Sequence, residues 1–257
     1  MNLKKISNVR GLRLFYPTVP VIVTAKSGGR FNAMPAAWAT PLSFIPPLVA
    51  VSIAPERYTY RLITESGYFA LNWVDFKYVK EVVYLGEVSG RYRGDKVSAA
   101  GFTVVKGERV PVLGEAVGVV ECRLKERFEV GDHDLFVGEC LAAYVSEDFT
   151  ETWRLKDYSP LLSLGSVRGV KRRRRFLSLE KEVVDVLCPV GEEVDKREKT
   201  VQRIREMAEN LSKESGRPIR LSEVASKVAE ELSIDSVDAE LIAEQLRREG
   251  RIRAVRG

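Results

Sequence analysis

The sequence predicts a mainly β protein with added helices: an antiparallel barrel over residues 1–170, followed by a small helical, winged-helix-like domain over residues 171–257. Three observations predict this. In the first part, short runs rich in Val, Ile, Phe and Tyr are separated by Gly and Pro. Two longer runs there alternate apolar and polar residues around a central GDH. In the second part, apolar residues recur every three or four positions.

The first strands of the predicted barrel are apolar runs bounded by turn residues. VPVIVTA (19–25) is followed by the turn KSGG, and the run FNAMPAAWAT (31–40) comes next. PPLVAVSIA (46–54) reads as a buried strand, because its prolines are confined to its start. YFALNWV (68–74) has the same character.

Two helices and one long hairpin complete the barrel. ERYTYRLITES (56–66) predicts a helix that ends at Gly67, and DFKYVKEVVYL (75–85) predicts a second one. The runs 118–130 and 134–146 alternate with period two and predict the arms of the hairpin. Many antiparallel strands with two inserted helices favour a closed barrel over a parallel sheet.

The second part predicts three helices and a short strand. The first helix is stopped by Gly216, the second is capped by Ser222, and the third ends at Gly250. RIRAV (251–255) follows as the strand, which gives the order of elements of a winged helix. KRRRR (171–175) is interpreted as a basic linker between the two parts.

Composition excludes several kinds of site. The net charge of +5, from 41 basic and 36 acidic residues, is too small to indicate nucleic-acid or membrane binding by itself. With three distant cysteines and one histidine we expect no metal site, although Cys122 and Cys140 face each other across the predicted hairpin. The chain starts without a signal-peptide pattern and has no 18-residue apolar segment, so we expect a cytoplasmic protein that does not span a membrane.

Two features of residues 20–74 favour a flat ligand that carries a phosphate. The run after the first turn is dominated by small residues, which let backbone groups reach the edge of such a ligand, and Trp38 can wall it or pack a dimer interface. Arg57, with the hydroxyl groups of Tyr58 and Thr59, lies at a helix start, where free N–H groups and the positive dipole end attract anions. The alternative is ordinary barrel packing and a solvated arginine.

Seven short motifs occur in one order along the first part of the chain: PVIVTA, SGG, NAMPAAW, PPLVAVSI, RYTYRLITESGYFALN, the looser RYRGDKVSAAGF, and GDHDLFVGE. In this order they resemble the flavin reductase-like family, the FMN-binding split β-barrels of the flavoredoxin type. The resemblance covers roughly residues 10–165 and does not extend to residues 171–257.

The resemblance implies an FMN site, a reductant and a partner. It implies that the flavin ring and ribityl chain lie against Asn32, Met34, Ala36, Ala37, Trp38, Ala39 and Thr40. It implies that the phosphate lies against Ser52, Arg57, Tyr58 and Thr59. The chain is then expected to be a homodimeric, NAD(P)H-dependent flavin reductase-like oxidoreductase. Its electrons would go to an acceptor protein, ferric iron or an oxygenase, and the sequence does not choose between NADH and NADPH.

His133 is the only histidine of the chain and lies at the predicted hairpin tip. Hydride transfer from nicotinamide to flavin depends mainly on alignment, so an imidazole beside the flavin can stack on the nicotinamide, bind its carboxamide or protonate the reduced flavin. We therefore take His133 as the candidate catalytic residue. The alternative is an exposed, inert turn histidine, with Asp132 and Asp134 only setting the turn.

The second part does not have the charge of a DNA reader. Residues 171–257 hold 20 Lys and Arg against 18 Asp and Glu, and the helix in the recognition position is rich in acidic residues. We therefore expect no nucleic-acid partner and favour a role in bracing a dimer or docking a partner. Two alternatives stay open: a non-catalytic flavin-binding electron carrier or sensor, and a flavin-gated DNA-binding regulator.

Overall fold

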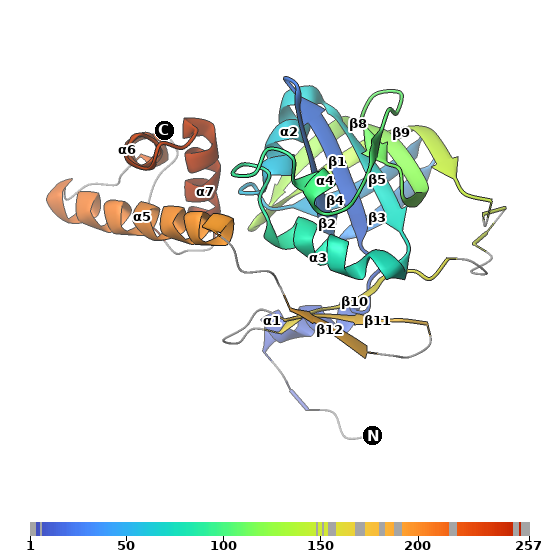
Figure 1. The fold of residues 1–257 in the computed structure, drawn as a ribbon. Helices are drawn as coiled ribbons and strands as arrows, with labels where there is room; N and C mark the ends of the chain where they lie inside the picture. The colour runs from blue at the N-terminus through green and yellow to red at the C-terminus, as the bar shows by residue number, and fades with distance from the viewer. Residues whose placement is uncertain are drawn as a thin grey trace.

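The computed structural model describes most of the chain (Figure 1). The residues that it describes are 4–5, 7–147, 149–150, 152–153, 158–167, 173–179, 183–187, 192–215, 220–248 and 252.

One antiparallel seven-stranded sheet dominates the fold. Its strands are β1 (Val21–Ser27), β2 (Arg30–Ala36), β3 (Ala39–Phe44), β4 (Pro47–Ile53), β5 (Tyr68–Val74), β8 (Ala116–Val130) and β9 (His133–Val145). The order across the sheet is β2-β1-β5-β8-β9-β4-β3. The two edge strands, β2 and β3, are joined by only Ala37 and Trp38. So short a link brings the two edges of the sheet together, and the sheet therefore curls round as a barrel does.

The run 31–40 is divided between two strands. Its first residues lie in β2 and its last two in β3, and the chain turns at Ala37–Trp38. The other predicted strands match closely: 68–74 is β5 without change, and 46–54 contains β4.

Helix α2 (Tyr58–Ser66) packs on β1 and β2. It ends where predicted, because Gly67 takes the left-handed conformation, φ 75°, that favours glycine at a helix end. The second predicted helix is a 3₁₀ turn, η2 (Phe76–Tyr78), followed by α3 (Val79–Glu87). Short elements complete this region: α1 (Asn8–Gly11), η1 (Leu12–Phe15), α4 (Lys96–Ala99), β6 (Val104–Val105) and β7 (Val112–Leu113).

The predicted hairpin is confirmed as β8 and β9, which pair from Gly118↔Val145 to Val130↔His133. Gly131, at φ 63°, makes the turn between them. Cys122 and Cys140 are register partners across this hairpin, as predicted, and both are free thiols.

The basic linker prediction is wrong for Arg173–Arg175. These residues lie in β11 (Arg173–Leu177), which pairs on one side with β10 (Leu162–Val167) and on the other with β12 (Val183–Leu187). Strand pairing on both sides, and an ion pair at 2.6 Å between Arg174 and Glu87 of α3, hold the arginines in the fold. The boundary at residue 170 falls outside the described residues and stays a prediction.

The three C-terminal helices are confirmed as α5 (Glu192–Ser215), α6 (Leu221–Leu232) and α7 (Ser236–Arg248). Ser222 is not the predicted N-cap, because Arg220 holds that position and Ser222 lies inside the first turn. Of the predicted strand 251–255 only Ile252 is described, and it is buried against the helices. Gly216 and Gly250, the predicted ends of the first and third helices, lie outside the described residues, and the winged-helix assignment stays a prediction.

The helices of the described part of the chain include none that combines the length and the apolar character needed to span a membrane.

Candidate functional site

The small-residue run forms a ledge at the junction of β2 and β3, and we use this name for residues 32–40. Along the ledge, burial falls from the β2 end to the β3 edge. Asn32 and Ala36 are buried, Trp38 is 43% exposed, and Thr40 is exposed. Met34, Ala37 and Ala39 are half-buried. The ledge is therefore partly open to solvent along its small residues, beside one exposed indole.

The ledge meets the hairpin tip at Trp38. The ring centroids of Trp38 and His133 are 5.0 Å apart, with the ring planes at 47°. Strand pairing explains this contact, because Ser52 donates its N–H to the Trp38 carbonyl at 2.9 Å and is also the register partner of Leu135 in β9. The structure thus brings together three predicted residues from β4, β9 and the ledge corner: Ser52, His133 and Trp38.

His133 occupies the first position of β9 and is partly accessible, with 26% of its side chain exposed. Its Nδ1 lies 2.8 Å from a carboxylate oxygen of Asp132. This contact occupies one ring nitrogen and leaves Nε2 for another partner.

Of the predicted phosphate residues, Arg57, Tyr58 and Thr59 lie at the start of α2, whereas Ser52 lies in β4. Arg57 is the N-cap, no side chain caps the helix, and the first turn contains no acidic residue. The first-turn N–H groups therefore retain their positive potential for an anion. Arg57 is exposed, and its guanidinium lies 3.3 Å from the Glu56 carboxylate, which offsets part of its charge.

A buried hydrogen bond joins the ledge to this helix. Asn32 donates from Nδ2 to the Thr59 hydroxyl at 2.7 Å, and both side chains are buried. Tyr58, between Arg57 and Thr59, is half-buried. The Asn32 side chain fits because residue 90 is glycine: a Cβ there would lie 2.2 Å from Asn32 Oδ1. The ledge and the helix start are therefore one connected unit.

Sequence reasoning missed two buried charges next to this unit. Lys96 is 3% exposed and donates to the carbonyls of Leu85 and Val88, both at 2.9 Å. Burial, and then the nearby Arg57 guanidinium, lowers the pKa of Lys96 to about 7. Asp134, next to His133, is fully buried. Both residues lie in motifs that the sequence analysis singled out, Lys96 in RYRGDKVSAAGF and Asp134 in GDHDLFVGE. Nothing in these motifs indicated that the two charges are buried.

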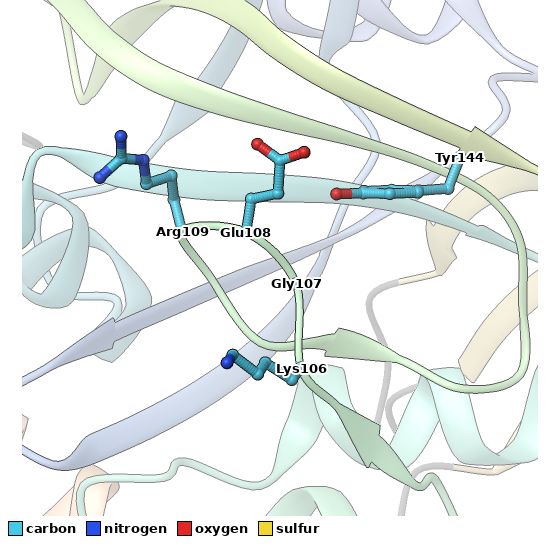
Figure 2. A pocket seen from close by; sticks show the side chains of 5 residues that line it. All are labelled: Lys106, Gly107, Glu108, Arg109 and Tyr144. Atoms are coloured by element: carbon cyan, nitrogen blue, oxygen red, sulfur yellow. The ribbon is translucent and has the colours of Figure 1, made fainter.

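A separate hollow lies at the other end of the hairpin. It is lined by Lys106, Gly107, Glu108, Arg109 and Tyr144 (Figure 2). Tyr144 pairs with Val119, eleven residues along β9 from His133. The hollow contains none of the predicted site residues, and its loop is held by a structural carboxylate, Glu121. We therefore place the functional site at the ledge.

Residues 12–165 match the flavin reductase like domain. The chain belongs to the flavin reductase-like family. This match includes the whole ledge, the start of α2 and His133, and it ends before the C-terminal helices.

Two relatives match most of this chain or about half of it. An uncharacterized protein of Aeropyrum pernix is 40% identical over 242 residues, 92% of each chain, so the likeness reaches into the C-terminal helices. A ferric-chelate reductase (NAD(P)H) of Archaeoglobus fulgidus is 30% identical over 53% of this chain and 80% of its own.

A solved structure confirms the predicted fold class. The FMN-binding protein from Thermus thermophilus superposes with a TM-score of 0.55 at 27% identity, over 74% of this chain and 98% of its own. The barrel is therefore a flavin reductase-like split β-barrel, with additional helices after it.

Proposed function

We propose that this flavin reductase-like protein binds FMN on the ledge, reduces it with NADH or NADPH, and passes the electrons to an acceptor. The observation that carries the proposal is the contact between Trp38 and His133 at the end of the ledge. It places an aromatic wall and an imidazole beside a surface of small residues. The names of two relatives, an FMN-binding protein and an NAD(P)H-dependent reductase, support the same cofactors.

The residues present fit a flat group that carries a phosphate. An uncapped helix start without acidic residues, with Arg57 beside it, suits the phosphate. The ledge residues Met34, Ala37 and Ala39 are half-buried, so part of their surface is open to a planar ring. Asn32 fixes the distance between these two parts through its bond to Thr59.

The chain's own residues would bind, orient and hold a proton. When bound, the flavin supplies the capacity to take up a hydride and release electrons. Trp38 would help to hold the ring system, and His133 would help to hold the nicotinamide. Since Nδ1 of His133 engages Asp132, Nε2 is the atom that would bind the carboxamide or hold the proton delivered to reduced flavin.

We predict that Arg57→Ala weakens FMN binding by about 1.5–3 kcal/mol, because a hydrogen bond to a charged phosphate is lost. This corresponds to about a tenfold to 150-fold higher Kd. FMN fluorescence quenching measures the affinity. Arg123→Ala is the matched control, since Arg123 is an exposed arginine of β8 paired with Glu139. Equal affinities of the two variants would move the phosphate away from α2.

We predict that His133→Ala slows hydride transfer by about tenfold to a hundredfold at saturating FMN, because the nicotinamide is no longer aligned. Anaerobic stopped-flow reduction with NADH and with NADPH measures the rate and the preferred reductant. Arg123→Ala, which changes an exposed residue of the same hairpin away from its tip, is the control. A rate for His133→Ala equal to that of the wild type would end the role of His133, and no reduction by the wild-type protein would favour an electron carrier or sensor.

A homodimer is part of this proposal. The β3–β4 turn exposes Phe44 and Ile45 almost fully, each at 94%, next to half-exposed Leu42. Apolar side chains of this size gathered at a sheet edge are typical of protein interfaces. A second copy covering this edge would also lie beside the ledge. The acceptor of the electrons would be a separate protein or an oxygenase that takes reduced flavin from the ledge.

We infer that nucleic acid is not a partner. In α7, the helix in the recognition position, Ile242 and Leu246 are buried in the helical core, and Asp238 and Glu244 are buried too. A helix covered in this way does not offer its side chains to a DNA groove.

A further inference from the structure

The carboxylate that follows His133 is buried and held by three elements. Asp134 is fully buried at the start of β9. Tyr60 of α2 donates its hydroxyl to Asp134 Oδ2 at 2.7 Å, and Arg127 of β8 lies 3.6 Å from the same oxygen. Burial, together with the bond to Asp134, raises the pKa of Tyr60, so it remains a protonated donor. The third partner is Arg248 of α7, whose guanidinium binds Asp134 Oδ1.

Arg248 reaches the hairpin from a helix that is itself fixed to the barrel. At the other end of α7, Asp238 lies 2.8 Å from Arg91 and 3.4 Å from Arg61, all with side chains less than a tenth exposed. Leu241, between the two ends, packs against the main core. Figure 1 shows α7 as the C-terminal helix nearest the barrel. Helix α7 is therefore held at both ends.

The Arg248–Asp134 pair strongly restrains the hairpin tip. Arg248 is 6% exposed and also binds Glu244 at 2.9 Å, so its direction is set by its own helix. Removing Arg248 would leave the buried Asp134 with only the Tyr60 hydrogen bond and the longer Arg127 contact, which is unfavourable. Asp134 also pairs through its backbone with Ile53 and Glu129 on either side. A shift of Asp134 would therefore move its neighbour His133.

We propose that Arg248 is a positioning residue: through Asp134 it holds the His133 ring against Trp38, so that the C-terminal helices complete the site on the barrel. The structural part of this inference stands on the contacts above, and its consequence for hydride transfer rests on the proposed function. It gives the C-terminal helices a role within the same chain.

The single histidine makes the test direct, because one imidazole gives one set of NMR signals. In flavin-free protein, the ring current of Trp38 shifts the Hε1 and Hδ2 signals of His133. Arg248→Met keeps an unbranched apolar stem and removes the guanidinium, and we expect it to move these signals toward free-histidine values and to broaden them. Asp134→Asn breaks the same pair from the other side and should move them in the same direction.

Two further variants separate positioning from general stability. Arg247→Met is the matched control, because Arg247 is the adjacent arginine of α7 and pairs with Glu244 at 2.8 Å. It should leave the His133 signals unchanged. Arg248→Lys keeps the charge and should restore them in part. If Arg248→Met does not fold, Asp134→Asn carries the test.

Unchanged His133 signals in folded Arg248→Met or Asp134→Asn would overturn the proposal. In the flavin-loaded protein, we expect Arg248→Met to lower the rate of reduction about tenfold while the Kd for FMN stays within a factor of two. Since the NMR test uses no flavin, wild-type protein that fails to bind FMN would contradict the proposed function and leave the result on Arg248 intact.

Discussion

Glu121→Ala is expected to destabilise the fold by about 3–5 kcal/mol, the cost of leaving several buried donors without their charged acceptor. The Glu121 carboxylate is fully buried and accepts the backbone N–H groups of Glu108, Arg109 and Val110 at 2.8, 2.7 and 3.0 Å. Urea unfolding at pH 7 measures the loss. The matched control is Glu115→Ala, since Glu115 also accepts a backbone N–H, but at an exposed position, and should cost less than about 1 kcal/mol.

The same carboxylate makes stability depend on pH. Burial alone would raise the pKa of Glu121, but the hydrogen bonds from the loop outweigh it and lower the pKa below its ordinary value. A depressed folded-state pKa gives stability that is present above the unfolded value of about 4.3 and is lost as pH falls through the folded pKa. The difference between wild type and Glu121→Ala should therefore shrink at acid pH. Equal losses for Glu121→Ala and Glu115→Ala at pH 7 would contradict this account.

Gly138→Ala is expected to destabilise the fold by about 2–3 kcal/mol through overpacking. A Cβ at residue 138 would lie 2.4 Å from Phe69 Cζ and 2.9 Å from Cys122 Cβ, and both side chains are fully buried. The strand cannot shift away, because β9 is paired on both sides. Thermal unfolding measures the effect.

Gly94→Ala is the control for that substitution, because no heavy atom lies within 4 Å of its added Cβ and its backbone is not left-handed. It should leave the Tm within a degree or two of the wild type, as a surface change does. If Gly138→Ala were equally neutral, the close packing of β9 on β5 would be wrong.

Local signals predicted much of this fold. Gly67 ended α2, GDH located the hairpin turn, and the order of short motifs located the ledge and the helix start. Each of these depends on residues close together in the chain, where the conformation of a glycine or the alternation of a strand decides the structure.

Such local signals could not predict side-chain contacts between residues that are far apart in the chain. Arg248 and Asp134 are 114 positions apart, and nothing near either residue marks it as one half of a buried pair. The contact between Trp38 and His133 likewise depends on how β4 is registered against β9, although the sequence pointed to both residues separately.

Charge patterns do not show which charged residues the fold pairs or buries. The run at 171–175 has the composition of a solvated linker, yet three of its arginines lie in a strand that is paired on both sides. Glu121 lies in an alternating run next to a register shift. Its side chain is buried, where its carboxylate accepts the backbone N–H groups of the loop at 108–110. Local polarity does not reveal which backbone groups elsewhere lack a partner.

The central claim is that FMN lies on the ledge with its phosphate at the start of α2, and a crystal structure of the protein with FMN tests it most directly. The account predicts the flavin ring beside Trp38 and His133, and the phosphate within hydrogen-bond distance of the first-turn N–H groups that follow Arg57. A ledge filled by the protein's own side chains, with FMN bound elsewhere or not at all, would contradict it.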